Sequence, residues 1–437
     1  MNYEKAVEFL DAHIGQGMKP GLERIRALME TMGDPQLAYP VIHITGSNGK
    51  TSTSRFASSI LVAHGLRVGT FTSPHLERIE ERFSLDGEYA TVTQFTEAVA
   101  DIVPFVELYE ERTGQTPTYF ELTAALAFSF FAMNAVDVAV IEVGLGGRLD
   151  ATNVVDGRVA VVTGISLEHT AWLGNSIEEI ATEKLAIAKP SSVLITGSLP
   201  ESAQILAAAR VEELGIQHRR FGAEFHPESV TMGVGGWAGS ISGVYETYDE
   251  LFLPLHGRYQ FENLALAVAA VEELSGRSLD PDAVREGVAA ATSPGRLEVV
   301  GHRPLVLLDG AHNTQAFEVL AASIEDEFPA AAWVLVIGVM GDKDLEAMLR
   351  QVEGQVGSVV ATAVDYERAV SVDEVARVAS TVLDVPVEVA PTVPDALEVA
   401  RRLAGPDGSI LVTGSLYVVG EARTALRGVS QESNGSA

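Results

Sequence analysis

Eight short segments that are mostly apolar, without polar alternation, recur along the chain and indicate buried β-strands. They are predicted at Val41–Thr45, Val136–Val143, Arg158–Thr163, Ser192–Thr196, Leu305–Asp309, Trp333–Gly338, Ser358–Thr362 and Ser409–Thr413. Strands of a parallel sheet read in this way because helices cover both of its faces. Helical patterns lie between many of them, at Ile177–Ala188, Asn263–Leu274 and Ala316–Glu327. The alternation predicts an α/β protein with doubly wound, mostly parallel sheets.

Two interruptions of this alternation indicate the domain organisation. From Phe221 to Leu255 the chain is rich in Gly, Ser, Thr and aromatic residues, which predicts a small antiparallel insertion at the sheet edge. A turn cluster at Thr292–Arg296 precedes a new series of strands. We therefore predict an N-terminal domain of residues 1–293 and a second, smaller Rossmann-like α/β domain of residues 296–437. The end, Ser430–Ala437, is expected to be frayed.

Charge and hydropathy exclude several classes of partner. The net charge of −30 argues against non-specific nucleic-acid binding, since a phosphate backbone would be repelled. The amphipathic N-terminus lacks the features of a signal peptide, and the apolar stretch at Ala124–Met133 is too short to span a bilayer. We expect a cytoplasmic protein without a membrane partner. The chain has no cysteine, which excludes disulfides and thiolate metal sites.

The segment PVIHITGSNGKTSTSRFASSIL joins a predicted strand through a glycine-containing turn to a helical pattern. Backbone N–H groups of such a turn and the N-terminus of the next helix attract phosphate, and Lys50 adds a positive charge. The first glycine, Gly46, lies four residues before the lysine, so the turn is shorter than the standard pattern. Thr51 or Ser52 is expected to place its hydroxyl on Mg²⁺. The segment predicts nucleotide binding.

Two further clusters follow predicted strands, at the edge where open α/β sheets bind ligands. Ser73, in the segment TFTSPH, offers a hydroxyl, although Ser-Pro is also a common turn. Glu142 ends a strand and is followed by the turn VGLGGRLDATN. A carboxylate in this position relative to a phosphate loop is a usual Mg²⁺ ligand, and the alternative is a solvent-exposed glutamate.

The segment SLEHTAWLG and the helix after it bring His169 and Lys184 to the same edge. Only six lysines stand beside 24 arginines in the chain, which makes each lysine a stronger functional candidate. A lysine near a metal and a triphosphate either binds phosphate or, once deprotonated, reacts with CO₂ to form a carbamate. Arginine performs only the first of these roles.

At this point a set of motifs resembles one family. The motifs TGSNGKTS, TSPHLERIEERFS, TYFE, EVGLGGRLDATN, LEHTAWLG, EKLAIAK, PGRLEVV, LDGAHN, GVMGDKD and VTGSLYVVGE occur in the order seen in folylpolyglutamate synthases and bifunctional dihydrofolate synthases. The resemblance covers about residues 5 to 425 and places the chain in a branch of the Mur ligase superfamily. It implies transfer of the ATP γ-phosphoryl group to a carboxylate, followed by attack of the L-glutamate amino group on the acyl phosphate.

The resemblance also implies roles for individual residues. Those expected to bind ATP are Ser47, Asn48, Gly49, Lys50, Thr51, Ser52, Asn263, Arg296, Asp309 and His312. Thr51 or Ser52, with Ser73 and Glu142, is expected to hold a first Mg²⁺, and Glu142, His169 and a carbamylated Lys184 a second. The pterin-bearing substrate is expected to contact His75, Thr118, Tyr119, Phe120, Glu121, Leu149, Asp150 and Ala151. Lys50, Glu142, His169 and Lys184 are the expected catalytic residues.

Two departures from the family pattern leave the expected chemistry in place. The loop has Gly-Lys-Thr-Ser where the family has Gly-Lys-Gly-Ser, and Glu168 stands where the family has Asp before the histidine. The sequence does not choose between dihydropteroate and tetrahydrofolate as the acceptor. The alternative interpretations are a Mur-type ligase for another carboxylate, a non-catalytic nucleotide-binding subunit and a small-molecule kinase. We expect a monomer, because both sides of the cleft come from one chain.

Overall fold

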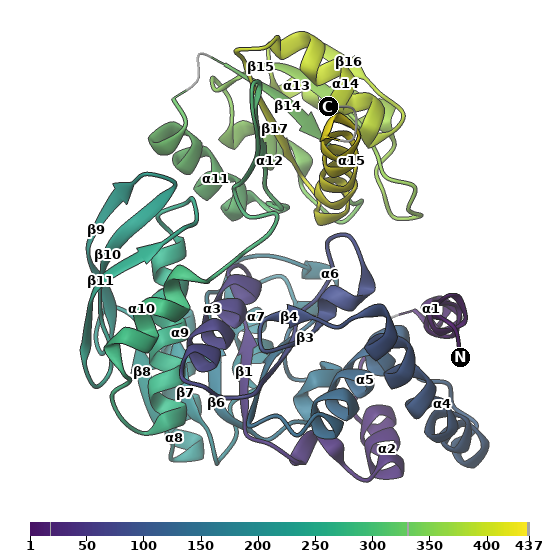
Figure 1. Cartoon of the computed structure of the whole chain (residues 1–437), viewed down its shortest axis with the longest axis vertical. Helices are drawn as coiled ribbons and strands as arrows, with labels where there is room; N and C mark the ends of the chain where they lie inside the picture. The colour runs from purple at the N-terminus through teal and green to yellow at the C-terminus, as the bar shows by residue number, and fades with distance from the viewer. Residues whose placement is uncertain (18, 330–331, 435–437) are drawn as a thin grey trace.

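The structure, a computed structural model, describes residues 1–17, 19–329 and 332–434, with residues 428–434 described as backbone only. Its strands form sheets of eight, three and six strands. Figure 1 shows the eight-stranded sheet in the lower lobe, the six-stranded sheet in the upper lobe and the three-stranded sheet at the side. The predicted α/β fold with mostly parallel sheets is confirmed.

The eight-stranded sheet has the order β4-β3-β2-β5-β1-β6-β7-β8. Its strands are β1 (Val41–Thr45), β2 (Val68–Phe71), β3 (Phe83–Leu85), β4 (Glu88–Tyr89), β5 (Val138–Glu142), β6 (Gly157–Val162), β7 (Val193–Thr196) and β8 (Gln217–Arg220). All pairs are parallel except those of β3 with β2 and with β4. Strand β1 lies between β5 and β6, so the loops after these three strands meet at one edge.

Helices cover both faces of this sheet (Figure 1). One face packs against α1 (Tyr3–Asp11), α2 (Glu23–Met32), α4 (Val92–Thr113), α5 (Tyr119–Met133), α7 (Ile177–Leu185) and α8 (Glu201–Leu214). The other packs against α3 (Lys50–Ala63), α9 (Gln260–Ser275) and α10 (Pro281–Ala289). Successive residues such as Val140 and Ile141 point to opposite faces, and both are fully buried. Short helical turns are η1 (Ile14–Gln16), η2 (Pro35–Leu37), η3 (Ile79–Arg82), η4 (Ala151–Val154) and α6 (Thr170–Leu173).

The predicted antiparallel insertion is present, but its position differs from the prediction. Strands β9 (His226–Gly233), β10 (Gly236–Ser242) and β11 (Thr247–Leu253) form a separate antiparallel sheet. Trp237, Ile241 and Tyr248 pack into the same core as α9 and α10. The sheet therefore lies over these helices and does not extend the edge of the larger sheet.

The six-stranded sheet has the order β12-β13-β17-β14-β15-β16, and only β12 is antiparallel to its neighbour. Its strands are β12 (Glu298–His302), β13 (Leu305–Leu308), β14 (Trp333–Ile337), β15 (Val356–Ala361), β16 (Val387–Val389) and β17 (Ser409–Thr413). Helices α11 (Thr314–Glu327), α12 (Leu345–Gln351) and α13 (Val372–Val382) cover one face. Helices α14 (Val393–Ala404) and α15 (Leu416–Asn434) cover the other.

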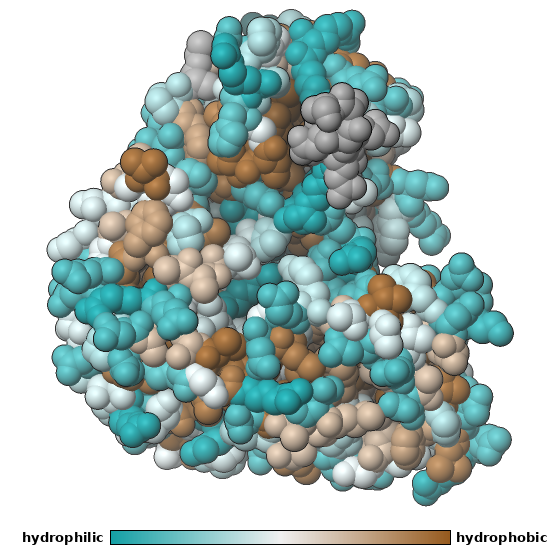
Figure 2. Space-filling model, in the orientation of Figure 1, coloured by the Kyte–Doolittle hydropathy of each residue, from teal (hydrophilic) through white to brown (hydrophobic). Residues whose placement is uncertain are grey.

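All eight predicted strands are present, with ends that differ by two residues or fewer. The expected frayed end is contradicted in part, because α15 continues to Asn434, and residues 435–437 lie outside the described residues. The hydropathy view shows mostly hydrophilic residues, with apolar ones in small groups (Figure 2). Over the described part of the chain, no helix has the length and apolar character needed to cross a membrane.

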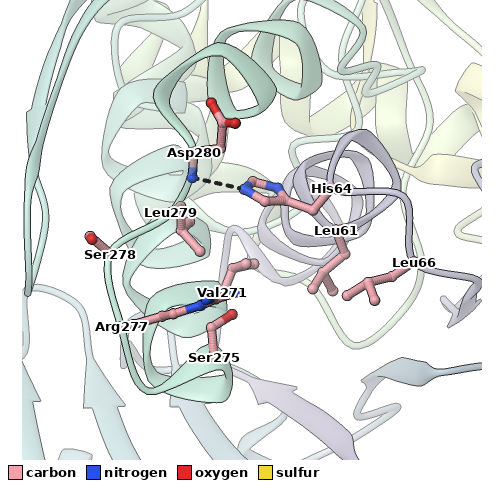
Figure 3. Close-up of a pocket in the computed structure, with 9 residues that line it drawn as sticks. All are labelled: Leu61, His64, Leu66, Val271, Ser275, Arg277, Ser278, Leu279 and Asp280. Carbon is pink, nitrogen blue, oxygen red and sulfur yellow. Dashed lines mark hydrogen bonds between the residues drawn. The ribbon is translucent and has the colours of Figure 1, made fainter.

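A cavity of about 350 Å³ lies at the ends of α3 and α9 that are remote from the phosphate loop (Figure 3). The backbone N–H of Asp280 donates to Nε2 of His64 there, at 3.2 Å. Helix α3 begins at Lys50 and has 14 residues, so it separates the two ends by roughly 20 Å. None of the predicted site residues lines this cavity.

Candidate active site

The predicted phosphate loop connects β1 to α3 and is tied to the strand beside it. The backbone N–H of Ser47 donates to the carbonyl of Gly164 at 2.8 Å, and Oγ1 of Thr163 donates to the carbonyl of Asn48 at 2.5 Å. Gly49 has a φ of +84°, and a side chain there would meet Asn263. These contacts fix a tight turn whose N–H groups precede the N-terminus of α3, which is the geometry that binds phosphate.

Lys50 folds back over this loop. Its Nζ donates to the carbonyl of Gly46 at 2.8 Å and to that of Ser47 at 3.2 Å. Asn263, from α9, lies against the other side of the loop and donates from Nδ2 to Gln260 at 3.0 Å. The structure thus brings the predicted residues Ser47–Thr51 and Asn263 together at the N-terminus of α3.

The two candidate hydroxyls of α3 point in different directions. Oγ1 of Thr51 donates to Oε1 of Glu142 at 2.9 Å. Ser52 is buried, and its Oγ shares a hydrogen bond of 2.9 Å with Oγ of Ser293. Consecutive helix residues are rotated by about 100°, so one residue faces the sheet edge when the next does not. Thr51 therefore lies beside the carboxylate, and Ser52 does not.

Glu142 ends β5 directly beside the loop and is 1% exposed. Burial raises the pKa of its carboxyl group, and Lys50 and the hydrogen bond from Thr51 oppose the shift. Oε2 accepts the backbone N–H of Ser73 at 3.4 Å. A buried carboxylate beside the hydroxyl of Thr51 and the backbone of Ser73 is an oxygen-bearing site of the kind that suits Mg²⁺.

Lys184 lies beneath the phosphate loop and is 1% exposed. Its Nζ donates to the carbonyl of Gly46 at 3.0 Å and pairs with Oε1 of Glu168 at 2.9 Å. Burial lowers the pKa of Lys184, although Glu168 opposes the shift. For Glu168, burial acts to raise the pKa, but the positive charges of Lys184 and Lys50 outweigh it and hold the pKa at about 2. The structure therefore contains a buried ion pair.

His169 faces the six-stranded sheet. Its Nδ1 is 3.5 Å from Oδ2 of Asp342, and Nζ of Lys343 is 3.0 Å from the same oxygen. Burial and the charge of Lys343 lower the pKa of His169 to about 4. In this structure His169 lies beside Asp342 and Lys184 pairs with Glu168, and neither forms a hydrogen bond or ion pair with Glu142. Over the described residues, no group of three His, Asp or Glu side chains is arranged as a metal site.

Residues after β13 form the opposite side of the site. Asp309 accepts the backbone N–H groups of Leu297 and Ala311, each at 2.8 Å, so both carboxylate oxygens anchor the turn that carries Arg296. His312 donates from Nδ1 to the carbonyl of Gly310 at 2.8 Å. Burial, then the charge of Lys343, lowers the pKa of His312 to about 4.

Asn313 links this side to the phosphate loop. Its Nδ2 donates to Oδ1 of Asn48 at 3.0 Å. Asn48 in turn donates to Oε1 of Gln315 at 3.0 Å. The charge of Arg296 also acts on Glu142 from across the gap. Residues from the two large sheets therefore meet directly over the loop.

Two of the predicted substrate contacts serve as a helix cap. Thr118 caps α5 by accepting the backbone N–H of Glu121 at 3.2 Å, and Glu121 accepts the N–H of Thr118 at 2.7 Å. Glu121 also pairs with Arg24 at 3.1 Å. The ring of Phe120 lies against Gly144, where a side chain would overlap it. These residues shape the wall beside the glycine-rich turn.

The glycine-rich turn after β5 is held by one carboxylate. Asp150 accepts the backbone N–H of Leu145 at 2.8 Å and the backbone N–H and hydroxyl of Thr152 at 2.9 and 2.5 Å. Ala151 is buried, whereas Leu149 is 36% exposed. Of the three predicted contacts here, Leu149 is the one whose side chain is accessible to a substrate.

His75 and Arg82 lie at the opposite wall. Nε of Arg82 donates to Nδ1 of His75 at 3.0 Å, and the guanidinium lies 5.5 Å from the ring centroid of Tyr119. Arg82 is 7% exposed, and among the described residues no carboxylate forms an ion pair with it. Burial, then the charge of Arg82, lowers the pKa of His75 to about 4. A buried guanidinium without a carboxylate partner is a binding group for an anion.

Comparisons with known proteins identify the family. The model of the Mur ligase middle domain matches residues 44–271, and that of the Mur ligase glutamate ligase domain matches residues 295–416. The chain is 39% identical to the dihydrofolate synthase/folylpolyglutamate synthase of Mycobacterium tuberculosis, over 93% of this chain and 90% of that protein. This chain belongs to the folylpolyglutamate and dihydrofolate synthase family.

Other members of the family agree over the full length. The protein of the same name from Bacillus subtilis is 33% identical, over 97% of this chain and 99% of its own. A solved Mycobacterium tuberculosis folylpolyglutamate synthase, complexed with ADP and AMPPCP, has a TM-score of 0.92 at 38% identity and covers 97% of this chain and 99% of that chain. The solved E. coli FolC in complex with DHPP and ADP has a TM-score of 0.87 at 31% identity, covering 98% and 99%.

The structure brings three further residues to the site, for which the sequence predicted no specific role, although Lys343 was a candidate as one of the few lysines. Arg82 lies in the motif TSPHLERIEERFS, and Asp342 and Lys343 lie in GVMGDKD. Both motifs supported the resemblance. The available signal for Arg82 and Lys343 was a basic side chain within a motif that is otherwise largely apolar or acidic. Whether such a side chain is buried depends on residues far away in the sequence.

Proposed function

We propose that this chain is an ATP-dependent ligase that joins L-glutamate to the carboxylate of a folate-type substrate. The family relationship supports the reaction class, since the relatives are named dihydrofolate synthase and folylpolyglutamate synthase. The observation that carries the proposal is the contact of Thr51 with Glu142 at the N-terminus of α3, opposite Arg296 and His312.

The proposed reaction has two steps. First, a carboxylate oxygen of the folate-type substrate attacks the γ-phosphorus of ATP, and the bond to the bridging oxygen of ADP breaks. Second, the amino nitrogen of L-glutamate attacks the acyl carbon of the resulting acyl phosphate, phosphate leaves, and the nitrogen loses a proton. Both reactants of the first step are anions, so the site must supply positive charge.

Several groups of this chain are suited to that task. Lys50 and the N-terminus of α3 would stabilise the phosphates from one side, and Arg296 from the other. His312 lies on the same side as Arg296 but supplies no positive charge, because burial lowers its pKa to about 4. We assign Asn263 and Asp309 to the same nucleotide site, Asp309 through the turn that it anchors. Thr51, Ser73 and Glu142 would hold Mg²⁺, which supplies charge neutralisation to the transferred phosphoryl group.

A second Mg²⁺, held by Glu142, His169 and a carbamylated Lys184, is a further proposal based on the family resemblance. A carbamate is an anion, and it would be repelled by the carboxylate of Glu168, which lies 2.9 Å from Lys184. The proposal therefore requires Lys184 to leave Glu168 before it reacts with CO₂. We assign no reaction step to this second ion.

The residues around the glycine-rich turn after β5 are proposed to bind the pterin-bearing substrate. His75, Tyr119 and Leu149 offer side chains, whereas Thr118, Phe120, Glu121, Asp150 and Ala151 would shape the wall through their caps and packing. Arg82 would bind a substrate carboxylate, because its charge is buried and the described residues offer it no carboxylate within ion-pair distance.

The variant Arg82→Gln is expected to raise the KM of either the folate-type substrate or L-glutamate by about 10-fold to 100-fold. The reason is that a charge-assisted bidentate contact with a substrate carboxylate is lost. The KM of ATP should change less than about twofold, since the nucleotide site is separate. Steady-state kinetics with each substrate varied in turn checks this. An unchanged KM for both L-glutamate and the folate-type substrate would contradict the role of Arg82.

The test of the proposed function is ADP release coupled to amide formation, with Mg²⁺, L-glutamate and either dihydropteroate or tetrahydrofolate in separate reactions. Product with dihydropteroate alone would define a dihydrofolate synthase, and product with tetrahydrofolate alone would define a chain extender. Product in both reactions would define a bifunctional enzyme. ADP release in neither reaction would favour a ligase for another carboxylate or a non-catalytic nucleotide-binding subunit.

We propose that the chain acts as a cytoplasmic monomer with domains 1–293 and 296–437. Residues of both large sheets already meet over the phosphate loop within one chain, as in the contact of Asn48 with Asn313. Sedimentation of active enzyme is expected to give a single species of about 46.4 kDa. Activity found only in a dimeric fraction would contradict this prediction.

A further inference from the structure

A loop that follows β2 of the eight-stranded sheet forms hydrogen bonds with α15, the last helix packed on the six-stranded sheet, next to the site. The loop, residues 73–82, carries Ser73, whose backbone N–H donates to Glu142, and the hydrogen-bonded pair of His75 and Arg82. It is held from inside by Glu81, whose carboxylate accepts the backbone N–H groups of Leu76, Glu77 and Arg78 at 2.8, 3.0 and 2.9 Å. This inner anchor fixes the loop's own shape.

The second anchor comes from α15 (Figure 1). Glu77 accepts hydrogen bonds from Nη1 of Arg423, from Oγ1 of Thr424 at 3.0 Å and from Nη1 of Arg427 at 3.2 Å. The side chains of Arg423 and Glu77 are 11% and 12% exposed, so this ion pair is largely desolvated. Arg423 has a second carboxylate partner, Glu298 of β12, which accepts a hydrogen bond from Nε of Arg423 at 3.0 Å. Such a pair is geometrically demanding and costly to break from one side.

Backbone packing supports the same contact independently. A Cβ atom on Gly420 of α15 would lie 1.9 Å from the carbonyl oxygen of Leu76. The Leu76 side chain packs into the core between the six-stranded sheet and α15. The helix can approach the loop this closely only because residue 420 has no side chain.

The first turn of the same helix reaches the same end of the site. Tyr417 stacks on Tyr366, with ring centroids 5.1 Å apart. Burial raises the pKa of Tyr417, and the nearby positive charge of Arg82 opposes this shift. One rigid helix therefore contacts the loop at Leu76 and Glu77 and also contributes a side chain near Arg82. A shift of α15 would move both together.

We propose that Glu77, Gly420 and Arg423 are positioning residues, which set the placement of loop 73–82, and through it Ser73, His75 and Arg82, by locking the loop to α15. This inference rests on the proposed function for its kinetic consequences. None of the three residues contacts the phosphate loop. They would act indirectly, because the position of Ser73, His75 and Arg82 would depend on the position of α15 and of the six-stranded sheet that it packs against.

Kinetics of Glu77→Gln, Arg423→Gln and the double variant test the proposal. Each single variant is expected to lower kcat/KM for the folate-type substrate by about 10-fold to 100-fold, since displacing a binding group by about 1 Å has effects of this size. The KM of ATP should remain within about twofold. The double variant should be no worse than the worse single variant, because both remove the same lock. Arg427→Gln is the matched control, since Arg427 is 62% exposed, and it should have less than about a threefold effect.

A second measurement does not depend on activity. Hydrogen–deuterium exchange of residues 74–82 is expected to be at least about tenfold faster in Glu77→Gln and in Gly420→Ala than in the unsubstituted chain, with unchanged exchange in the phosphate loop. Gly420→Ala keeps every charge and tests the close approach alone. If the unsubstituted chain forms no product but exchange accelerates as stated, the lock stands and the proposed function fails. Unchanged exchange, or an equal loss for ATP and for the folate-type substrate, would overturn the proposal.

Discussion

Replacing Lys184 by alanine is expected to reduce glutamate-dependent ADP release by about 10³-fold, on the scale of removing a preorganised charged group from an active site. The ammonium group supports the carbonyl of Gly46 in the phosphate loop and neutralises Glu168. Without it, a carboxylate remains buried and unpaired beside the phosphates. Turnover is measured at a temperature at which circular dichroism shows the variant to be folded.

Addition of short-chain carboxylic acids to Lys184→Ala separates the two proposed roles of this lysine. Partial recovery of turnover is expected if a carbamate is the working form, because the acid replaces its anionic group. Failure of recovery, together with an equal loss in Glu168→Gln, would assign the role to the ion pair alone. The matched control is Lys5→Ala on the exposed face of α1, which should leave turnover unchanged. Unimpaired turnover of Lys184→Ala would contradict both roles.

Glu142→Gln is expected to raise the half-saturating Mg²⁺ concentration by about 10-fold to 100-fold and to lower turnover at saturating Mg²⁺ by at least about 10²-fold. The amide is nearly the same size, but it lacks the negative charge that a hard cation requires. A Mg²⁺ titration of ADP release measures both effects.

Two neighbouring hydroxyls provide the control for this titration. Thr51→Ala removes the group that donates to Glu142 and should also raise the Mg²⁺ requirement, whereas Ser52→Ala removes a contact with Ser293 and should leave it within about twofold. A Mg²⁺ requirement that is the same in Glu142→Gln and in the unsubstituted chain would exclude this carboxylate as a ligand.

Most central strands could be predicted from the sequence, whereas the edge strands and the short interior strand β2 were missed. The apolar run of β1 is buried on both faces and has an unmistakable pattern. Strand β8, with the sequence QHRR, is an edge strand whose residues are partly exposed, so it carries no such pattern. Strand β12 pairs antiparallel at the other sheet's edge and was missed for the same reason. Only hydrogen bonding to a neighbour defines these strands.

The sequence by itself determined the fold class, the phosphate loop and the family, because apolar runs, glycine turns and helix starts are encoded by residues close together in the chain. It did not determine which of Thr51 and Ser52 faces Glu142, since that depends on the rotation of α3 against β5. Nor did it reveal the pairing of Lys184 with Glu168, or the lock of Glu77 with Arg423. The last two residues are 346 positions apart, and only the packing of α15 against the loop brings them together. Buried charge pairs depend on the geometry and dielectric surroundings created by the complete fold, and tertiary structure alone decides them.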